Sequence, residues 1–367
     1  MNIFWFSGRS LKDLCSTTQV ALAAGLINRG HTLTFVNSDP EGSHTNRPWI
    51  HQPIPSRAPP GLQSKNLGRN MKRWFTSKAV DGPSVALVDW RIAKTLVPLF
   101  RQRNIPWILM DRSPPADKGL LSLLQWPSWR RSWKLAMKGD SSRGCVVSKA
   151  HRNFVINKTG ARSESIVILP AGVDLEGFRT GDRFEKFTLI YHGRLDRHRG
   201  VMALPMLLRK SQSLGIEAKL ILVGEGDAVS GLKAIAEKDA TIDVRQSLPQ
   251  KELAELLSKC HVGLLPMPKR KMWTIASPLK RSEYAASGLL IYGIDHAGHR
   301  FTTNEELGWM NLVSQEEFHD AGVKWLADMQ ESDFEALSLK SRLFAEQNLA
   351  WERTVEALDN AIHSLSK

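Results

Sequence analysis

The chain of 367 residues contains little cysteine and no long hydrophobic run. Its three cysteines (Cys15, Cys145 and Cys260) are too few and too far apart for a disulfide framework or a cysteine metal site. No apolar stretch approaches the roughly 18 residues that a membrane-spanning helix requires. The apolar part of the opening MNIFWFSGRS is too short for a secretory signal and predicts a first strand instead. These absences favour a globular protein of the reducing cytoplasm.

Acidic residues are scarce in the first half of the chain. Residues 1–180 contain 26 Lys and Arg against 11 Asp and Glu, whereas the remaining residues contain 24 against 26. Eight of the 12 tryptophans also lie within 1–180. A basic, tryptophan-rich half indicates contact with an anionic surface, for which lipid headgroups and nucleic acid are the two candidates. No aromatic RNA-binding motif or zinc-ligand spacing is present, so we expect no nucleic-acid partner.

Strand-like and helical segments alternate along the chain. NIFWF (2–6), a helical pattern at 16–28 and HTLTFV (31–36) form a β-α-β unit, which implies a parallel sheet. Further strands are expected at 85–90, 107–111, 144–148, 165–173, 187–191, 218–226, 242–245, 261–267 and 289–294, and further helices at 201–210, 229–238, 250–259, 278–287 and 333–364. Residues 38–66 predict a long loop. The pattern restarts after Gly172, which predicts an α/β fold of two doubly wound, Rossmann-like domains that face each other across a cleft.

The stretch HGRLDRHRG (192–200) places Arg194 and Arg199 at an expected turn between a buried strand and a helix, with Gly193 and Gly200 on either side. Fixed cations beside a helix N-terminus form an anion site, because backbone N–H groups and the positive end of the helix dipole face the ligand. Guanidinium groups grip phosphate bidentately, so a diphosphate is the expected ligand. A solvated loop with ordinary surface arginines is the alternative.

Six segments, in order, resemble glycosyltransferase family 4, whose members are nucleotide-sugar enzymes of the GT-B fold. They are a glycine turn before a first helix that ends in NRGHTLTFV, then VILPAGVDLEGF, HGRLDRHRG, LILVGEGD, LPQKELAELLSKCHVGLLP and SPLKRSEYAASG. The resemblance covers essentially the whole chain and is weakest between about 38 and 140. It implies an acceptor-binding N-terminal domain (1–175) and a nucleotide-sugar-binding C-terminal domain (180–345). It also implies that a last helix, at about 350–367, packs back on the N-terminal domain.

By position, Arg194 and Arg199 correspond to the Arg and Lys pair with which the family holds the donor diphosphate without a metal. The leaving diphosphate gains negative charge as the glycosidic bond breaks, and preorganised cations stabilise that charge most in the transition state. The resemblance therefore implies a retaining transfer that needs no metal and no cofactor beyond the nucleotide-sugar substrate.

SPLKRSEYAASG (277–288) supplies the second group of candidates. Glu283 holds the position of the family's carboxylate that accepts hydrogen bonds from ribose, and a helix-stabilising carboxylate is the alternative. Ser277 and Pro278 precede a helix whose first N–H groups are expected to face phosphate or sugar, and Lys280 adds charge there. Many relatives carry an earlier glutamate where this chain has Ile275, so the catalytic role of that position stays open.

Further positions are assigned from the same resemblance. Gly224 and Glu225 form a turn that approaches the nucleotide in the family, with an ordinary β-α turn as the alternative. Leu248 lies in a loop that contacts the base through backbone atoms. Gly8 lets the chain approach donor phosphate or acceptor closely.

The family often has a histidine after a middle strand of the first domain, and none follows WILM (107–110) here. Asp111 and Arg112 occupy this strand end, where a catalytic, ligand-facing group is expected. A local salt bridge or a helix cap is the alternative for this pair. His151, which follows the next strand, is predicted to be structural.

WPSWRRSWKLAMK (126–138) places tryptophans at helical spacing among basic residues, which is typical of an interfacial helix. A buried aromatic stripe is the alternative, and it is slightly favoured for the tryptophans. Together with KNLGRNMKRWFTSK (65–78), the basic residues are expected to form a face toward anionic lipid. The membrane-facing candidates are Lys72, Arg73, Arg130, Arg131, Lys134 and Lys138.

These features predict a retaining hexosyltransferase that moves a sugar from a nucleotide-sugar donor to a hydroxyl of a lipid or lipid-linked glycan. We expect it in the cytoplasm, peripherally bound to the inner face of the membrane. A nucleotide-sugar epimerase of the same fold and a catalytically inactive partner subunit are the alternatives. The sequence does not distinguish UDP, GDP and ADP donors.

Overall fold

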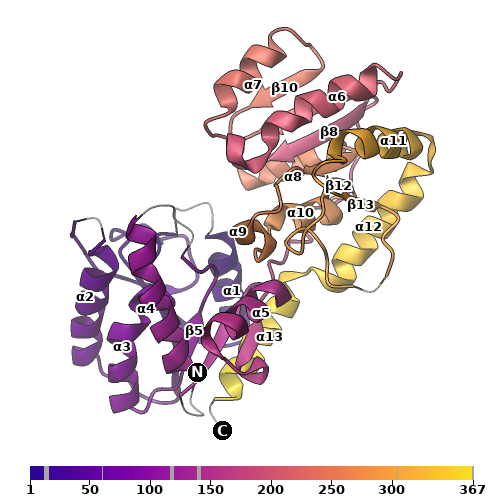
Figure 1. The fold of residues 1–367 in the computed structure, drawn as a ribbon. Coiled ribbons are helices and arrows are strands. Elements are labelled where there is room, and N and C mark those ends of the chain that lie inside the picture. The colour runs from indigo at the N-terminus through magenta and orange to yellow at the C-terminus, as the bar shows by residue number, and fades with distance from the viewer. Residues whose placement is uncertain (12–15, 60, 116–119, 139–141, 304, 366–367) are drawn as a thin grey trace. The chain divides into compact units, whose positions relative to one another are not determined.

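The structure is a computed structural model that describes residues 1–11, 16–59, 61–115, 120–138, 142–303 and 305–365. The chain divides into two compact units (Figure 1). Unit 1 comprises Met1–Pro170 and Trp351–Lys367, and unit 2 comprises Ala171–Ala350. The chain therefore leaves unit 1 after Pro170 and returns to it with its last helix.

Unit 1 is built on a seven-stranded parallel sheet in the order β3-β2-β1-β4-β5-β6-β7. Its strands are β1 (Asn2–Phe6), β2 (Thr32–Asn37), β3 (Ile50–Pro53), β4 (Ser84–Asp89), β5 (Trp107–Met110), β6 (Ser142–Val146) and β7 (Ile166–Ile168). Its helices are α1 (Thr17–Asn28), α2 (Gln63–Ser77), α3 (Trp90–Gln102), α4 (Leu120–Ala136), α5 (Lys149–Thr159) and α13 (Trp351–His363). The order reverses between β1 and β4, as in a doubly wound sheet.

The two faces of this sheet have separate cores because alternate side chains of each strand point to opposite faces. In β1, Ile3 and Trp5 pack in the core shared with α1 and α13, whereas Phe4 and Phe6 pack in the core shared with α2, α3 and α4. Trp129 of α4 lies fully inside the second core, with Trp133 beside it. The buried-stripe interpretation of these two tryptophans is therefore confirmed, and the interfacial one is wrong for them.

Unit 2 contains a six-stranded parallel sheet in the order β10-β9-β8-β11-β12-β13. Its strands are β8 (Phe187–His192), β9 (Ala218–Val223), β10 (Ile242–Arg245), β11 (Val262–Leu265), β12 (Leu290–Ile294) and β13 (Met310–Val313). Its helices are α6 (Leu204–Gln212), α7 (Val229–Ala236), α8 (Gln250–Lys259), α9 (Lys271–Thr274), α10 (Leu279–Ala286), α11 (Phe318–Glu331) and α12 (Phe334–Asn348). One continuous apolar core fills the unit.

Two sequence predictions differ from the structure. Residues 38–66 are not one long loop, because β3 forms at Ile50–Pro53 and α2 begins at Gln63. The helix expected over 333–364 is broken between α12 and α13. At the break Ala350 forms a parallel bridge with Val173, and the Val173 amide donates to the Leu349 carbonyl at 2.8 Å. These extended-backbone contacts end one helix and start the next.

Helix α13 packs on α1, where Gly25 allows the close approach. A Cβ atom at Gly25 would lie 2.3 Å from Cγ2 of Val355. Asp359 of α13 accepts from Arg29 at 3.2 Å and contacts Nε2 of His31 at 2.8 Å. Among the described residues, no helix combines the length and the apolar character that crossing a bilayer requires.

Candidate active site

The sheet of unit 2 reverses its order between β8 and β11, which marks the carboxyl end of β8 as the expected ligand position. Strand β8 ends at His192, and Gly193 and Arg194 follow directly. The chain then makes two short 3-10 turns, so α6 begins at Leu204, three residues later than the predicted 201. The HGRLDRHRG stretch therefore lies at the switch point of the sheet.

Both predicted arginines converge on one carboxylate there. Arg194 donates through Nη2 and Nε to Asp196 at 3.0 and 3.2 Å, and Nε of Arg199 lies 3.5 Å from Oδ2 of Asp196. Burial alone would raise the pKa of Asp196, but the hydrogen bond and charge of Arg194 lower it overall. The side chain of Arg194 is 42% exposed and that of Arg199 is 20% exposed. Asp196 thus holds two cations close together while leaving the first open to solvent.

Aromatic and sulfur groups fix the second cation. The Arg199 guanidinium lies over the ring of Trp273 at 4.5 Å from its centroid, and Nη1 approaches Sδ of Met267 at 3.8 Å. Lys280 of α10 adds a third cation. Its Nζ lies over the ring of Tyr191, 5.3 Å from the ring centroid. A Cβ atom placed on Gly193 would lie 2.8 Å from Nζ of Lys280. The predicted Arg194, Arg199 and Lys280 are thus gathered around the turn after β8.

Gly224 allows the turn after β9 to pack closely against the turn after β8. It has a φ of 146°, and a Cβ atom there would lie 1.8 Å from the carbonyl oxygen of Gly193. Only glycine fits such a contact between two backbones. The next residue, Glu225, is exposed and accepts at its carbonyl from the Leu195 amide at 2.8 Å. The turn after β9 therefore lies against the turn after β8.

Glu283 of α10 is buried, and its Oε2 lies 3.2 Å from Nε2 of His192. His192 in turn packs edge-on against Tyr284, which is fully buried. The pair joins the end of β8 to α10 and orients the Glu283 carboxylate. The sequence predicted a role for Glu283 but not for its partner His192. Asp196, His192 and Trp273 were missed, although the first two stand inside the HGRLDRHRG stretch.

The remaining site residues predicted in unit 2 contact other protein groups or the apolar core. Pro278 is the residue before α10, as predicted. The Ser277 hydroxyl accepts from the Ala171 amide at 3.0 Å and from Arg281 at 3.3 Å, so protein groups already use it. Leu248 is half-buried against the core of the unit. Ile275 is buried as well, and its apolar side chain supplies no carboxylate.

In unit 1, Asp111 does not face a ligand. It is 1% exposed, and its Oδ2 accepts from the indole N–H groups of Trp129 and Trp133 at 2.6 and 2.8 Å. Nε2 of the fully buried His151 lies 3.4 Å from the same oxygen, in line with the structural role predicted for that histidine. A carboxylate so enclosed holds α4 on the sheet, which corrects the predicted catalytic role of Asp111.

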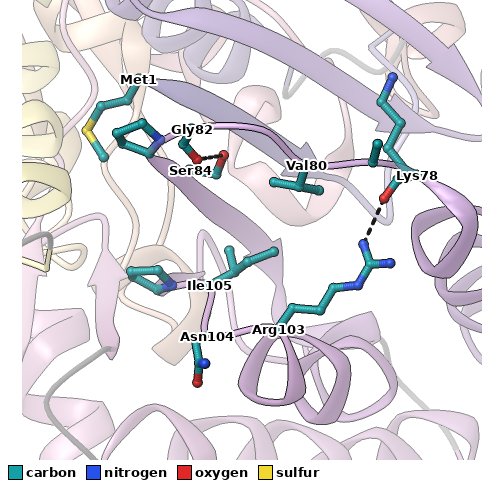
Figure 2. A pocket seen from close by; sticks show the side chains of 11 residues that line it. Met1, Lys78, Val80, Gly82, Ser84, Arg103, Asn104 and Ile105 are labelled. Atoms are coloured by element: carbon teal, nitrogen blue, oxygen red, sulfur yellow. Dashed lines mark hydrogen bonds between the residues drawn. The ribbon is translucent and has the colours of Figure 1, made fainter.

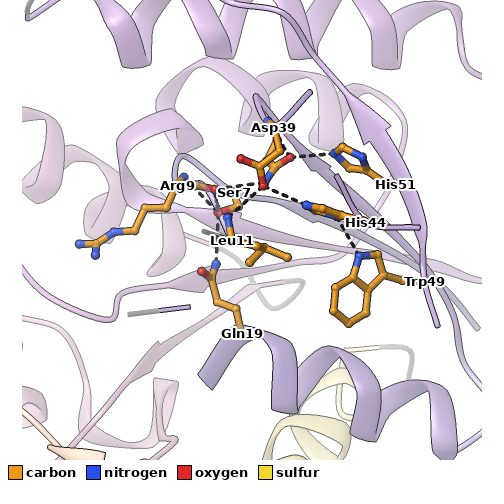
Figure 3. Close-up of polar contacts among 9 residues, drawn as sticks. Ser7, Arg9, Leu11, Gln19, Asp39, His44, Trp49 and His51 are labelled. Atoms are coloured by element: carbon orange, nitrogen blue, oxygen red, sulfur yellow. Dashed lines mark hydrogen bonds and ion pairs between the residues drawn. The ribbon is translucent and has the colours of Figure 1, made fainter. Parts of the chain in front are cut away.

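A polar network orders the turn after β1 (Figure 3). Asp39 Oδ2 accepts from the Leu11 amide at 2.9 Å and from Asn37 at 2.7 Å, and it lies 2.9 Å from Nε2 of His44. Trp49 donates to Nδ1 of His44 at 3.1 Å, so the proton of this ring is on Nε2 and points to Asp39. Asp39 thereby fixes the loop that carries the predicted Gly8.

One surface cavity and one cluster of metal-type ligands lie away from these strand ends. A surface cavity of about 540 Å³ is lined by Met1, Ser84 and Ile105, at the amino ends of the strands of unit 1 (Figure 2). Within the described ranges, the metal-type cluster is His31, Asp359 and His363. Arg29 already pairs with Asp359, so a second cation there is disfavoured and the cluster fastens α13 to α1.

No protein-family model and no curated protein sequence matches this chain. Its fold is similar to solved glycosyltransferases. A glycosyltransferase from Rickettsia africae has a TM-score of 0.78 at 12% identity, covering 100% of this chain and 98% of that one. HepE from Anabaena in complex with UDP has a TM-score of 0.74 at 12% identity, with 99% of this chain and 99% of that one covered. WaaG, a glycosyltransferase involved in lipopolysaccharide biosynthesis, gives 0.68 at 15% identity, with 98% and 99% covered. The predicted GT-B fold class is confirmed.

Proposed function

We propose that this protein is a glycosyltransferase that moves a sugar from a nucleotide-sugar donor to a hydroxyl group. The observation that carries the proposal is the cation group of Arg194, Arg199 and Lys280 at the switch point of unit 2. A diphosphate has the charge and the oxygen geometry that such a group recognises. The structural neighbour HepE was solved with UDP, which supports a nucleotide donor.

In this proposal the three cations stabilise the charge that develops on the departing diphosphate. They are preorganised by Asp196, Trp273 and Tyr191, so little reorganisation is needed at the moment of reaction. No metal is required, because guanidinium and ammonium groups neutralise the diphosphate. We further propose that Glu283 accepts hydrogen bonds from ribose and that transfer retains the anomeric configuration.

A calorimetric screen against UDP-, GDP- and ADP-sugars tests the donor part. We expect one nucleotide series to bind, and Arg194→Ala to weaken that binding about tenfold, because a charge-assisted hydrogen bond to phosphate is lost. Arg209→Ala is the matched control, since Arg209 is exposed on α6, where it pairs with Asp239, away from the turn after β8. Absence of binding for every nucleotide would refute the proposal. Binding without turnover would instead favour the inactive partner subunit that Ile275 suggests.

For the acceptor we propose a lipid or a lipid-linked glycan, reached at an anionic membrane surface on the cytoplasmic side. The helices α2, α3 and α4 contain no Asp or Glu within their bounds. The exposed basic candidates on or directly after them are Lys72, Arg73, Arg130, Arg131, Lys134 and Lys138. Leu123 and Leu124 of α4 are 62% and 70% exposed, which adds apolar groups suited to the headgroup boundary.

Vesicle flotation tests this surface. The protein is expected to float with vesicles of phosphatidylglycerol and phosphatidylcholine at low salt, and the double variant Arg131→Gln, Lys134→Gln to bind about tenfold more weakly. Lys233→Gln, Lys238→Gln, an equal charge change on exposed residues of unit 2, is the control. Equal binding of both double variants would remove the membrane part of the proposal and leave the transfer chemistry untouched.

A further inference from the structure

Two loops meet at the carboxyl edge of the unit 2 sheet, where the neighbouring strands β11 and β12 end. The loop after β11 contains Met267 and leads into α9 with Trp273, the two residues that hold Arg199. The loop after β12 comprises residues 295–300. A Cβ atom on Gly298 of this second loop would lie 2.0 Å from the carbonyl oxygen of Trp273. The backbones of the two loops are therefore in direct contact.

His296 joins the two loops by hydrogen bonds and is 2% exposed. The Gly298 amide donates to its Nδ1 at 3.2 Å, so Nδ1 carries a lone pair and the ring proton is on Nε2. Nε2 then donates to the Met267 carbonyl at 3.2 Å. One neutral imidazole thus closes its own loop and holds the neighbouring loop.

A second histidine supports the first. The ring of His299 lies 3.8 Å from that of His296, centroid to centroid, and its side chain is fully buried. Its Nδ1 lies 2.7 Å from the Ile294 carbonyl, so the proton of this ring is on Nδ1. Its Nε2 is enclosed and has no hydrogen-bond partner within the part of the chain that the structure describes. His296 therefore rests against a ring that is fixed to the end of β12.

The charges around the two rings keep them neutral. The charged groups that face them are Asp295 of the same loop, Lys269 of the loop after β11, and Lys280 and Arg281 of α10. Burial lowers the pKa of His296, and the hydrogen bond to Met267 and the charge of Asp295 offset this only in part. Burial also lowers the pKa of His299, well below its usual value. Both rings are neutral at pH 7, which is the form that their hydrogen bonds require.

We propose that His296 is a positioning residue for Arg199 and acts through Met267 and Trp273. It fixes the backbone of Met267, whose Sδ lies 3.8 Å from Nη1 of Arg199. Its loop also packs on the carbonyl of Trp273, whose ring lies under the Arg199 guanidinium. The inference rests on the proposed function, because it assumes that Arg199 contacts the donor diphosphate. Protonation of Nδ1 would set two N–H groups against each other at Gly298, so the support is lost in acid.

A double-mutant cycle tests the route through Arg199. In His296→Asn the new oxygen can still accept from the Gly298 amide, as in an Asx turn, but the donor to Met267 is lost. Calorimetry at pH 7.5 uses inorganic pyrophosphate and the best bound of UDP, GDP and ADP. We expect His296→Asn to weaken binding about fivefold, and to weaken it no further when Arg199→Ala is already present. His261→Asn, at the amino end of β11, is the control and should bind like the parent protein.

A second substitution acts on the backbone contact between the two loops. Gly298→Ala places a methyl group against the Trp273 carbonyl and should weaken binding by a similar factor. Gly308→Ala is its control, because a Cβ atom there meets its nearest listed neighbour, Leu337, only at 4.0 Å. If His296→Asn does not fold, as judged by circular dichroism, Gly298→Ala takes its place in the cycle with Arg199→Ala.

The pH dependence separates positioning from simple packing. Glutamine at position 296 can reach the Met267 carbonyl with its amide nitrogen and does not titrate, so His296→Gln should bind like the parent protein at pH 7.5. Because the pKa of His296 is lowered in the folded protein, its neutral form is complete above about pH 6.5 and is lost as the pH falls below that value. The affinity of the parent protein relative to His296→Gln should therefore fall from pH 6.5 to pH 5. The ligand's own protonation, near pH 6, cancels in this ratio.

The outcomes distinguish this inference from the proposed function. Failure of the parent protein to bind any nucleotide or pyrophosphate refutes both. Binding that His296→Asn leaves unchanged refutes the positioning role alone, as does a loss of the same size with and without Arg199→Ala. A constant affinity ratio between the parent protein and His296→Gln from pH 7.5 to pH 5 would also overturn it. Nitrogen NMR that finds the proton of His296 on Nδ1 at pH 7 would contradict the hydrogen bonds on which it depends.

Discussion

Arg199→Ala is expected to lower kcat for sugar transfer by about 10²- to 10³-fold, the usual loss when one preorganised group that stabilises developing charge is removed. Arg199 is held by Asp196, Trp273 and Met267, so its position is fixed before any ligand arrives. A cation placed in advance costs no reorganisation in the transition state, which is why we expect kcat to fall more than donor affinity. Steady-state kinetics with the donor found by the nucleotide screen measures both quantities.

Arg199→Lys provides the internal comparison for this prediction. Lysine keeps the charge but loses the planar fork and part of the stacking on Trp273, so an intermediate kcat is expected. Arg209→Ala should behave like the unchanged protein. A wild-type kcat in Arg199→Ala would mean that Arg199 is only a packing partner of Trp273, and the transfer mechanism would need another cation.

The central strands of both sheets were predictable because their sequences carry strong signals. NIFWF and FTLIY are buried on both faces, and each coincides with a strand. The missed strands β3 and β13 are both edge strands, at opposite ends of their sheet orders. IHQP and MNLV are only half-buried or exposed along their length, so neither shows the apolar run that marks a central strand.

Residues of the candidate site could be predicted only where they belong to a recognisable sequence motif. Arg194 and Arg199 stand in a recognisable stretch, but their common partner Asp196 could be found only from coordinates. Asp111 shows the opposite case. A carboxylate at a strand end suggests a ligand-facing group, yet the indoles that enclose it come from α4, 18 and 22 residues further along the chain. Such tertiary contacts leave no mark in local sequence.

Asp39→Asn is expected to lower the stability of unit 1 by about 2 kcal/mol at pH 7. Burial alone would raise the pKa of Asp39, but hydrogen bonds from Ser10, the Leu11 amide, His44 and Asn37 lower it from 3.8 to about 2. A shift of this size corresponds to about 2 kcal/mol between the two protonation states. The folded chain binds this proton less readily than the unfolded chain, so the stabilisation is complete above about pH 4 and is lost as the pH falls toward 2.

Hydrogen exchange of the Leu11 amide is the most direct measurement, because that N–H donates to Asp39 Oδ2 and reports on the loop that holds Arg9. Asp39→Asn should accelerate this exchange and lower the unfolding free energy near neutral pH, and both differences should shrink as the pH falls below 4. Glu41→Gln is the matched control, since Glu41 is exposed in the same loop. A difference between Asp39→Asn and the parent protein that stays constant from pH 7 to pH 2 would show that the side chain acts by packing and not by charge.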